Sequence, residues 1–206
     1  GTEANPYEVG DVEQLQCIEE QGPNANYVQV SDIDAVETAV WNDNRGFEPI
    51  GRVGSGTMFN GTFDGGGHEI TGLTIDRVGP TVGLFGRVGS PGMVANASFR
   101  QAEIVGGGSV GLVGTNQGTV QGSSVSGTFE ATAGSNAGAL VGTNFGTVRD
   151  SSASGEVTAP KEGGGLVGFN EGIVRDSSAS GEVTGPDIMG GLVGQTRGGI
   201  VRDSSA

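Results

Sequence analysis

The chain has 206 residues, 42 of them glycine, and a formal net charge of −14. Glycine at this level without a Gly-X-Y triplet excludes a collagen helix, and a single cysteine excludes a disulfide framework or a cysteine metal site. No stretch approaches the roughly 18 apolar residues of a membrane-crossing helix. No basic patch with interleaved aromatic residues indicates a nucleic-acid partner.

The acidic balance is the second strong compositional signal. Asp and Glu total 24 against 10 basic residues, and Lys161 is the only lysine. Acidic surfaces with very few lysines are typical of proteins from high-salt environments, where screening removes the self-repulsion. We therefore expect a halophilic source, with an ordinary acidic secreted protein as the alternative. The aromatic content of 5% predicts a thin, aliphatic core.

The first predicted element is a short helix near the N-terminus. Asp11, with Gln14 three residues later, is typical of a helix N-cap. The helix should end near Gly22-Pro23, and we expect Cys17 to be a buried structural thiol within it. Its apolar face is formed by Val12, Leu15 and Ile18.

Strands and turns follow this helix. Residues 27–30 alternate like a strand, residues 61–68 form a glycine-rich turn, and residues 70–75 read as another strand. No repeat is visible before residue 80. We therefore expect residues 1–80 to form an N-terminal cap and the first coils of whatever fold the later repeats build.

A repeat dominates residues 81–206. The frame Gly-Leu-(Val/Phe)-Gly recurs at intervals of 28, 28, 26 and 26 residues, beginning at Gly83, Gly111, Ala139, Gly165 and Gly191. A serine-rich stretch travels in phase with it, beginning at Ser123, Ser151, Ser177 and Ser204. Self-similarity at a period of this size indicates a stacked, solenoid-like architecture.

Each repeat contains a strand such as residues 110–113, a turn, a second strand around Val120, the serine-rich stretch, and a short strand such as residues 156–158. Three short strands separated by turns make one coil of a parallel β-helix, with coils about 4.8 Å apart. A β-propeller, the alternative, needs about 40 or more residues per blade. The sequence therefore predicts an all-β, right-handed parallel β-helix with a short helix in its cap, in which residues 1–80 and 81–206 form one continuous solenoid domain.

Equivalent positions of stacked coils form ladders along the axis. One interior ladder is expected from Leu84, Leu112, Leu140, Leu166 and Leu192. Another is expected from Val120, Val148, Val174 and Val201. Three asparagines each precede a glycine by two residues and are expected in turns that tolerate positive φ: Asn116, Asn144 and Asn170.

The repeated Gly-Gly-Leu-Val-Gly, followed by Asn-x-Gly and Ser-Ser-Ala-Ser-Gly, resembles the GLUG repeat of bacterial and archaeal secreted proteins. Residues 59–70 and Gly83-Leu-Phe-Gly86 resemble the segment that usually precedes such repeats, so the resemblance covers about residues 48–206. It implies a large extracellular or surface-anchored protein, often adhesin-like and sometimes an accessory region of a secreted protease, with a repeat that is not catalytic. Ala139 and Gln195-Thr-Arg-Gly198 depart from the pattern, which weakens the turn assignment there.

Catalytic or metal chemistry has few candidates. His68 is the only histidine, and a Ser-His-Asp arrangement with Asp64 lacks a marked nucleophile, so we expect a structural His68. Asp150, Asp176 and Asp203 form a row that suggests a calcium or lyase site, because stacked carboxylates repel unless neutralised. An arginine precedes each aspartate, so a solvated Arg/Asp edge is the preferred interpretation. Neither a cofactor nor a metal is expected.

The serine-rich stretches offer hydroxyl groups for glycan binding or O-glycosylation, but we favour small residues that fill a narrow coil. Two sequons, at Asn60 and Asn96, are candidates for N-glycosylation in an extracellular setting. The chain stops partway through a repeat at Ala206. We expect either that the native protein continues or that this end docks onto another subunit, head to tail, in a filament.

We therefore expect a non-catalytic, extracellular or cell-surface structural and adhesive protein. Its expected partners are surface glycans or copies of itself stacked end to end. The alternatives are a carbohydrate-active β-helix enzyme, of the polysaccharide lyase or hydrolase kind, and a glycan-binding module. In the enzyme alternative, Asp64 and Asp176 would be required for turnover.

Overall fold

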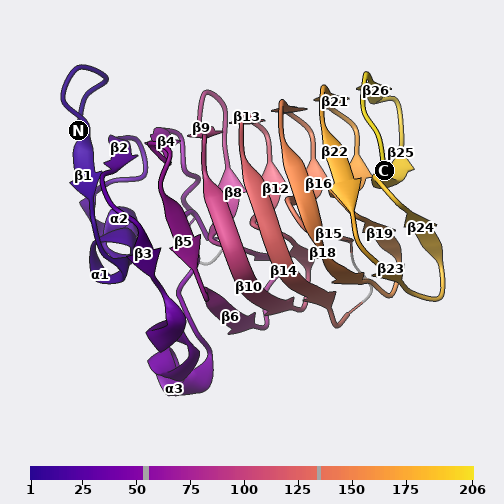
Figure 1. Ribbon diagram of the computed structural model, residues 1–206, viewed down its shortest axis with the longest axis horizontal. Coiled ribbons are helices and arrows are strands. Elements are labelled where there is room, and N and C mark those ends of the chain that lie inside the picture. The colour runs from indigo at the N-terminus through magenta and orange to yellow at the C-terminus, as the bar shows by residue number, and fades with distance from the viewer. Residues whose placement is uncertain (53–55, 134–135) are drawn as a thin grey trace.

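The computed structural model describes residues 1–52, 56–133 and 136–206. Four sheets run along one long axis, and successive coils add one strand to each sheet (Figure 1). Strands of neighbouring coils pair in parallel and in register, as β13 (Thr119–Gln121) does with β17 (Thr147–Arg149). The predicted all-β parallel β-helix with a short helix in its N-terminal segment is confirmed. Within the described ranges, no helix is long and apolar enough to cross a membrane.

Two eight-stranded sheets form the longer walls. Sheet A runs, in spatial order, through β1 (Tyr7–Val9), β2 (Asn26–Gln29), β4 (Thr62–Asp64), β9 (Met93–Ala95), β13, β17, β21 (Ile173–Arg175) and β26 (Ile200–Arg202). Sheet B contains β3 (Ile33–Asp34), β5 (Glu69–Thr71), β10 (Ser98–Gly106), β14 (Ser124–Ala131), β18 (Ser152–Thr158) and β22 (Ser178–Ser180), with β6 (Thr74–Arg77) beside β10 and β23 (Val183–Thr184) beside β18.

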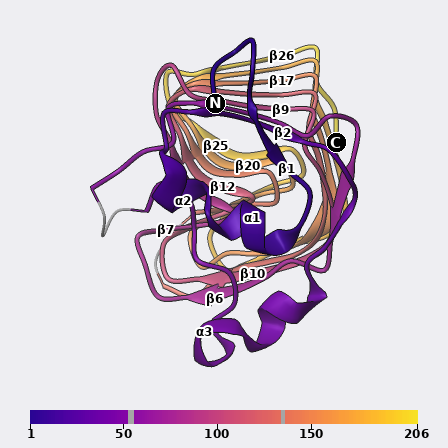
Figure 2. The same cartoon turned by 90° about the vertical axis from the view of Figure 1, so that its left-hand side faces the viewer.

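Two five-stranded sheets complete each coil. Sheet D contains β7 (Thr81–Val82), β11 (Ser109–Val110), β15 (Ala137–Gly138), β19 (Glu162–Gly164) and β24 (Ile188–Gly190). Sheet C contains β8 (Phe85–Val88), β12 (Val113–Asn116), β16 (Val141–Asn144), β20 (Val167–Asn170) and β25 (Val193–Thr196). The view along the axis in Figure 2 shows the coils superposed.

The prediction of three strands per coil was wrong, because a full coil has four. The expected strand at residues 110–113 is divided at Gly111-Leu112, where the chain turns from sheet D into sheet C. The expected strand at residues 70–75 is divided in the same way, at Gly72, whose φ is +75°. Residues 61–68 are a strand, β4, followed by the turn, and not a turn throughout.

The N-terminal helix forms where the sequence predicts it. Asp11 Oδ1 accepts a hydrogen bond from Gln14 N at 2.7 Å, and the Gln14 side chain accepts one from Gly10 N at 2.8 Å. The helix continues as two short pieces, α1 (Val12–Gln16) and α2 (Ile18–Gln21), and ends at Gly22. A second excursion, η1 (Val36–Val40) with α3 (Trp41–Asn44), projects from the side of the coils (Figure 1).

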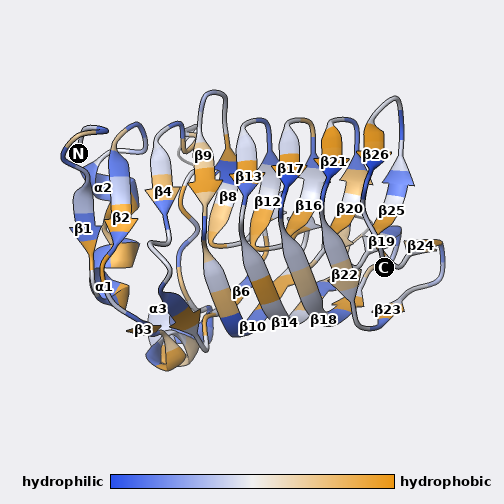
Figure 3. Cartoon of the chain, turned by 45° about the horizontal axis from the view of Figure 1, so that its top comes forward, coloured by the Kyte–Doolittle hydropathy of each residue, from blue (hydrophilic) through white to orange (hydrophobic). Residues whose placement is uncertain are grey.

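The core changes character along the axis. Hydrophobic segments recur from strand to strand along sheet A in Figure 3, and the later coils are filled by Leu, Val and Ala, as expected. The expectation of an aliphatic core was wrong for the first coils, because six of the eight phenylalanines are fully buried. Phe85 contacts Phe59 and Phe63, with ring centroids 4.9 and 5.6 Å away.

Candidate functional site

The three predicted asparagines lie inside the coil and form a hydrogen-bonded ladder. Asn116 Nδ2 donates to Asn144 Oδ1, and Asn144 Nδ2 donates to Asn170 Oδ1, both at 2.8 Å. All three are completely buried at the ends of sheet C strands. The expectation of positive φ was wrong, because none of them adopts it. A buried amide must satisfy both its donor and its acceptor, and the next coil supplies the missing partner.

The predicted leucine and valine ladders occupy equivalent places in successive coils. Val120, Val148 and Val174 are completely buried and stack in sheet A, whereas Val201 is 40% exposed in the last coil. Leu84, Leu112, Leu140 and Leu166 are buried at the corner between sheets D and C, and Leu192 is partly buried. Both ladders become partly exposed to solvent in the last coil, where no further described strand packs against them.

The first serine of each serine-rich stretch forms a second polar ladder. The Ser151 N–H donates to Ser177 Oγ at 3.2 Å, and Ser151 Oγ donates to Arg149 O at 2.7 Å. The same pair of bonds recurs at Ser123 and Ser177. These buried serines satisfy backbone groups at a corner of the coil. The serines at the second and fourth positions of the stretch instead lie on the outer face of sheet B, exposed at Ser152, Ser154, Ser178 and Ser180.

The predicted aspartate row has a backbone cause. Asp150, Asp176 and Asp203 have φ of 52°, 51° and 50°, and Asn96 and Gly122 occupy the same corner of earlier coils with φ of 50° and 58°. Asp, Asn and Gly are the residues that tolerate this left-handed conformation. Each aspartate also lies beside the arginine that precedes it, with 3.0 Å between Arg149 Nη1 and Asp150 Oδ2. In the described part of the chain, no three acidic, histidine or cysteine side chains converge as a metal site.

The last glycine of the Gly-Leu-Val-Gly frame fits a close contact between sheets. A Cβ on Gly142 would lie 2.7 Å from Val110 N and 2.8 Å from Gly114 O, both backbone atoms of the preceding coil. Gly114, Gly168 and Gly194 have equivalent surroundings. Sheet C therefore packs backbone against backbone on sheet D. The frame had predicted a repeat, but not this contact.

The proposed catalytic pair is not assembled. His68 Nδ1 lies 3.5 Å from Asp32 Oδ1, at the surface. Asp64 Oδ1 instead accepts hydrogen bonds from Gly66 N at 3.0 Å and from Asn96 Nδ2 at 3.1 Å. Asp64 therefore holds a turn and the neighbouring coil, and His68 has a different acidic neighbour.

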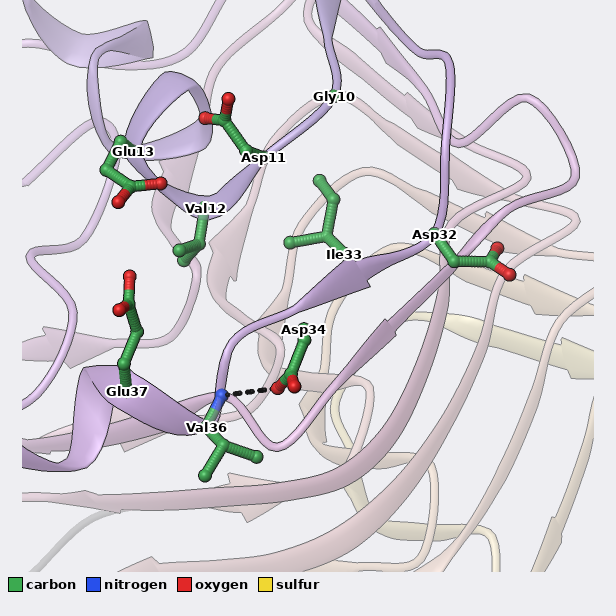
Figure 4. Close-up of a pocket in the computed structure, with 9 residues that line it drawn as sticks. All are labelled: Gly10, Asp11, Val12, Glu13, Asp32, Ile33, Asp34, Val36 and Glu37. Atoms are coloured by element: carbon green, nitrogen blue, oxygen red, sulfur yellow. Dashed lines mark hydrogen bonds between the residues drawn. The ribbon is translucent and has the colours of Figure 1, made fainter.

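The N-terminal cap carries an acidic groove of about 600 Å³, shown in Figure 4. It lies between the start of α1, strand β3 and η1. Five of its lining residues are acidic and none is basic: Asp11, Glu13, Asp32, Asp34 and Glu37. Asp34 Oδ1 accepts a hydrogen bond from Val36 N at 3.0 Å, and Asp11 caps α1. Asp32 Oδ1 accepts a third such bond, from Glu69 N at 2.9 Å, so three of the five carboxylates have local structural roles.

The two sequon asparagines differ in setting. Asn96 is exposed at its left-handed corner, and its Nδ2 donates to Asp64. Asn60 is partly buried, and its Nδ2 donates to Asn24 Oδ1 at 3.0 Å. The prediction of a buried Cys17 was wrong, because Cys17 is exposed between α1 and α2. Val12, Leu15 and Ile18 take the inward face there, which turns position 17 to solvent.

The fold and its interior ladders define a β-solenoid protein. The family model described as "The GLUG motif" matches residues 133–158 and 162–184. These two stretches of the chain are therefore similar to the GLUG motif.

Two relatives and one solved structure are similar. "Halomucin" of Haloquadratum walsbyi is 42% identical over 135 residues, which are 62% of this chain and 2% of halomucin. A "Putative Gly-rich membrane protein" of Evansella cellulosilytica is 36% identical over 132 residues, or 61% of this chain and 15% of that protein. The crystal structure of "a putative immunoglobulin A1 protease" from Bacteroides ovatus superposes with a TM-score of 0.74 at 18% identity, covering 99% of this chain and 76% of the other. At that identity the superposition shows a shared fold alone.

Proposed function

We propose that this chain is a non-catalytic structural and adhesive module of a larger extracellular or cell-surface protein. The observation that carries the proposal is the pair of buried inter-coil ladders, in which Asn144 and Ser151 each bond to the equivalent residue of the next coil. Residues repeated at these positions build length and stiffness. The names of the relatives, halomucin and a Gly-rich membrane protein, support a surface role, and the chain spans only a small part of either.

The enzyme alternative is disfavoured by the positions of its two candidate carboxylates. Asp64 ends β4, and Asp176 follows β21, four strands further along sheet A. Four strand spacings are roughly 19 Å, whereas the two carboxylates of a glycosidase lie within about 10 Å. Each also has a structural role, Asp64 in a turn and Asp176 at a left-handed corner.

The proposed partners are surface glycans and further coils stacked end to end. In the last coil, the ladder positions Val201 and Ile200 are 40% and 52% exposed, and Leu192 is partly exposed. Another coil, from the same polypeptide or from a second copy, would cover them. Electron microscopy of negatively stained protein in high salt tests self-stacking: filaments of regular width support it, and isolated short rods contradict it.

A halophilic setting is part of the proposal. The net charge of −14 and the single lysine support it, because dense carboxylates need screening to coexist on a small surface. N-linked glycans are proposed at Asn60 and Asn96, of which Asn96 is the more exposed. Intact-mass measurement of the protein from its native host, before and after glycan release, tests this modification.

The surface assignment is tested on intact cells that make the whole protein. Protease added outside the cells should release peptides of residues 81–206, while a cytoplasmic control protein stays intact. Protection of the module until the cells are lysed would overturn the assignment. The non-catalytic assignment is tested separately, by incubating the purified chain with a panel of polysaccharides. Product that disappears in the Asp64→Asn variant would contradict it.

A further inference from the structure

A small hollow of about 280 Å³ lies beside the start of sheet D. Its lining includes Glu48, Arg52 and Arg77, together with the loop that leads into β7 and the first residue of that strand, Thr81. Two guanidinium groups therefore face one carboxylate in a chain whose net charge is −14. The acidic groove of the cap has the opposite composition, with five carboxylates and no basic side chain.

The Arg77 side chain is held rigidly in this hollow. Its Nε donates to Phe47 O and its Nη2 donates to Gly46 O, both at 3.0 Å. The nearest carboxylate oxygen to Nη1 is Glu48 Oε1, 3.9 Å away, which is beyond hydrogen-bond distance. Nη1 is thus a fixed donor without an acceptor among the described residues. A guanidinium held in this way is pre-organised to bind an oxyanion.

Thr81 supplies a second unmatched donor. Its Oγ1 is buried and has no hydrogen-bond partner in the part of the chain that the structure describes. A buried hydroxyl without a partner costs free energy that a ligand can recover by accepting its hydrogen bond. Arg77 and Thr81 both line the hollow.

Electrostatics at Arg77 also favour an anion. Burial, followed by the positive charges of Arg45 and Arg52, lowers the pKa of Arg77. Arg52 forms an ion pair with Glu48, so one carboxylate serves both arginines. An added negative charge would oppose the repulsion among these guanidinium groups.

We propose that this hollow binds an oxyanion, the sulfate or carboxylate group of an acidic saccharide, through Arg77 Nη1, Arg52 and Thr81 Oγ1. The volume suits one such group with its sugar ring and not a long chain lying in a cleft. Only the saccharide source rests on the proposed surface function, because the donors would bind a free oxyanion as well.

Calorimetric titration with sodium sulfate tests the site. Ionic strength is held constant with NaCl, and the fluorescence of Trp41 gives a second signal. Trp41 is the only tryptophan, and its ring lies against Phe47, whose carbonyl accepts from Arg77. We expect one saturable site per chain. Loss of one charge-assisted donor in Arg52→Gln should weaken binding roughly tenfold or more.

Thr81→Val provides a variant that keeps the shape of the side chain and both arginines. It should weaken sulfate binding several-fold while the circular dichroism spectrum stays unchanged. Arg100→Gln is the matched control, since Arg100 lies on sheet B beside Glu69 and does not line this hollow. The proposal is overturned by an absence of saturable sulfate binding in the wild type. Equal affinity of Thr81→Val and Arg52→Gln with the wild type would overturn it too.

Competition experiments then identify the source of the anion. A sulfated or a uronic-acid oligosaccharide should displace sulfate from the wild type, and its neutral counterpart should not. Sulfate binding without displacement by either oligosaccharide would overturn the saccharide assignment. That result would leave the surface location to be decided by the intact-cell experiment.

Discussion

Asn116 Nδ2 donates a hydrogen bond to Asn144 Oδ1, 2.8 Å away and one coil further along the axis. Asn144 repeats the bond to Asn170. Each amide also reaches backbone, as Gly118 N donates to Asn116 Oδ1 at 3.1 Å. One buried side chain therefore fixes a turn in its own coil and the position of the next coil along the axis.

Replacing the central amide should be costly. Asn144→Ala leaves Asn116 without its acceptor and Asn170 without its donor, both in a dry interior. We expect a loss of about 2–4 kcal/mol in the free energy of unfolding, measured by guanidinium denaturation. Gln117→Ala, at an exposed neighbouring position, is the control and should change stability little. Equal stability of the two variants would show that the ladder contributes nothing.

The close contact between sheets C and D predicts intolerance of a single methyl group. Gly142→Ala would place Cβ 2.7 Å from Val110 N, and a backbone atom cannot move aside as a flexible side chain can. We expect roughly 3 kcal/mol or more of destabilisation, or failure to fold. In Gly107→Ala the nearest atom would be 3.5 Å from Cβ, so that variant should fold normally. Thermal unfolding of both variants provides the comparison.

At the aspartate row, stability should depend on whether the residue tolerates a left-handed backbone and not on a bound metal ion. At the left-handed corner, Asp176→Gly and Asp176→Asn should keep the melting temperature near that of the wild type. Asp176→Val should lose about 1–2 kcal/mol, because a β-branched side chain disfavours positive φ. Calcium or EDTA should leave all four proteins unchanged. A calcium-dependent rise in the wild type alone would instead indicate a cation site.

The raised pKa of the Tyr27 hydroxyl predicts that the protein loses stability in alkali. Burial, and then the charge of Tyr7, raise its pKa from 10.0 to about 12. The folded protein therefore keeps a proton that the unfolded chain releases. The contribution of Tyr27 to the free energy of unfolding is fully present below pH 10. It is lost as the pH rises through about 12, by up to roughly 3 kcal/mol.

The Tyr27→Phe variant isolates this effect. It loses the hydrogen bond from the Tyr27 hydroxyl to Gly22 O, 2.9 Å long, and should be about 1 kcal/mol less stable at pH 8. Its stability should fall less steeply than that of the wild type between pH 10 and 12. Tyr7→Phe, at a position 47% exposed, should retain most of the wild-type slope. Parallel slopes in all three proteins would exclude Tyr27 as the titrating group.

The charge balance predicts a requirement for salt. Screening lengths shorten from roughly 30 Å at 0.01 M to about 3 Å at 1 M, so repulsion among 24 acidic residues weakens steeply. We expect the β-sheet circular dichroism signal to be lost on dialysis from molar to millimolar NaCl and to return in KCl as well as NaCl. A spectrum that is the same at both salt concentrations would contradict a halophilic adaptation.

The sequence predicts the fold well because the period determines the register. Once coils of 26 to 28 residues stack, Val120 must lie near Val148, whatever the exact turns are. It predicts conformation at single positions less well. Asn-x-Gly fits both an exposed turn and a buried ladder, and only tertiary packing places Asn116 inside.

Features that join separate parts of the chain were missed. The donors of Arg77 and Thr81 meet because β6 and β7 flank one loop, and no motif marks their position. The close contact at Gly142 could not be predicted either, because its neighbours Val110 and Gly114 belong to another coil. The left-handed corner had a visible signal, since only Asn, Gly and Asp occupy it, at Asn96, Gly122 and Asp150.

The inter-coil hydrogen bonds of the buried asparagine and serine ladders run the same way. Asn116 donates toward Asn144, and the Ser123 N–H donates to Ser151 Oγ, in each case from the earlier coil to the later one. These two ladders are therefore vectorial, with donors directed toward the C-terminal end of the stack and acceptors toward the N-terminal end. An inverted coil would place donor against donor at the C-terminal end, or acceptor against acceptor at the N-terminal end. Only units that share this polarity can continue the two ladders, which gives the module an orientation as well as a length.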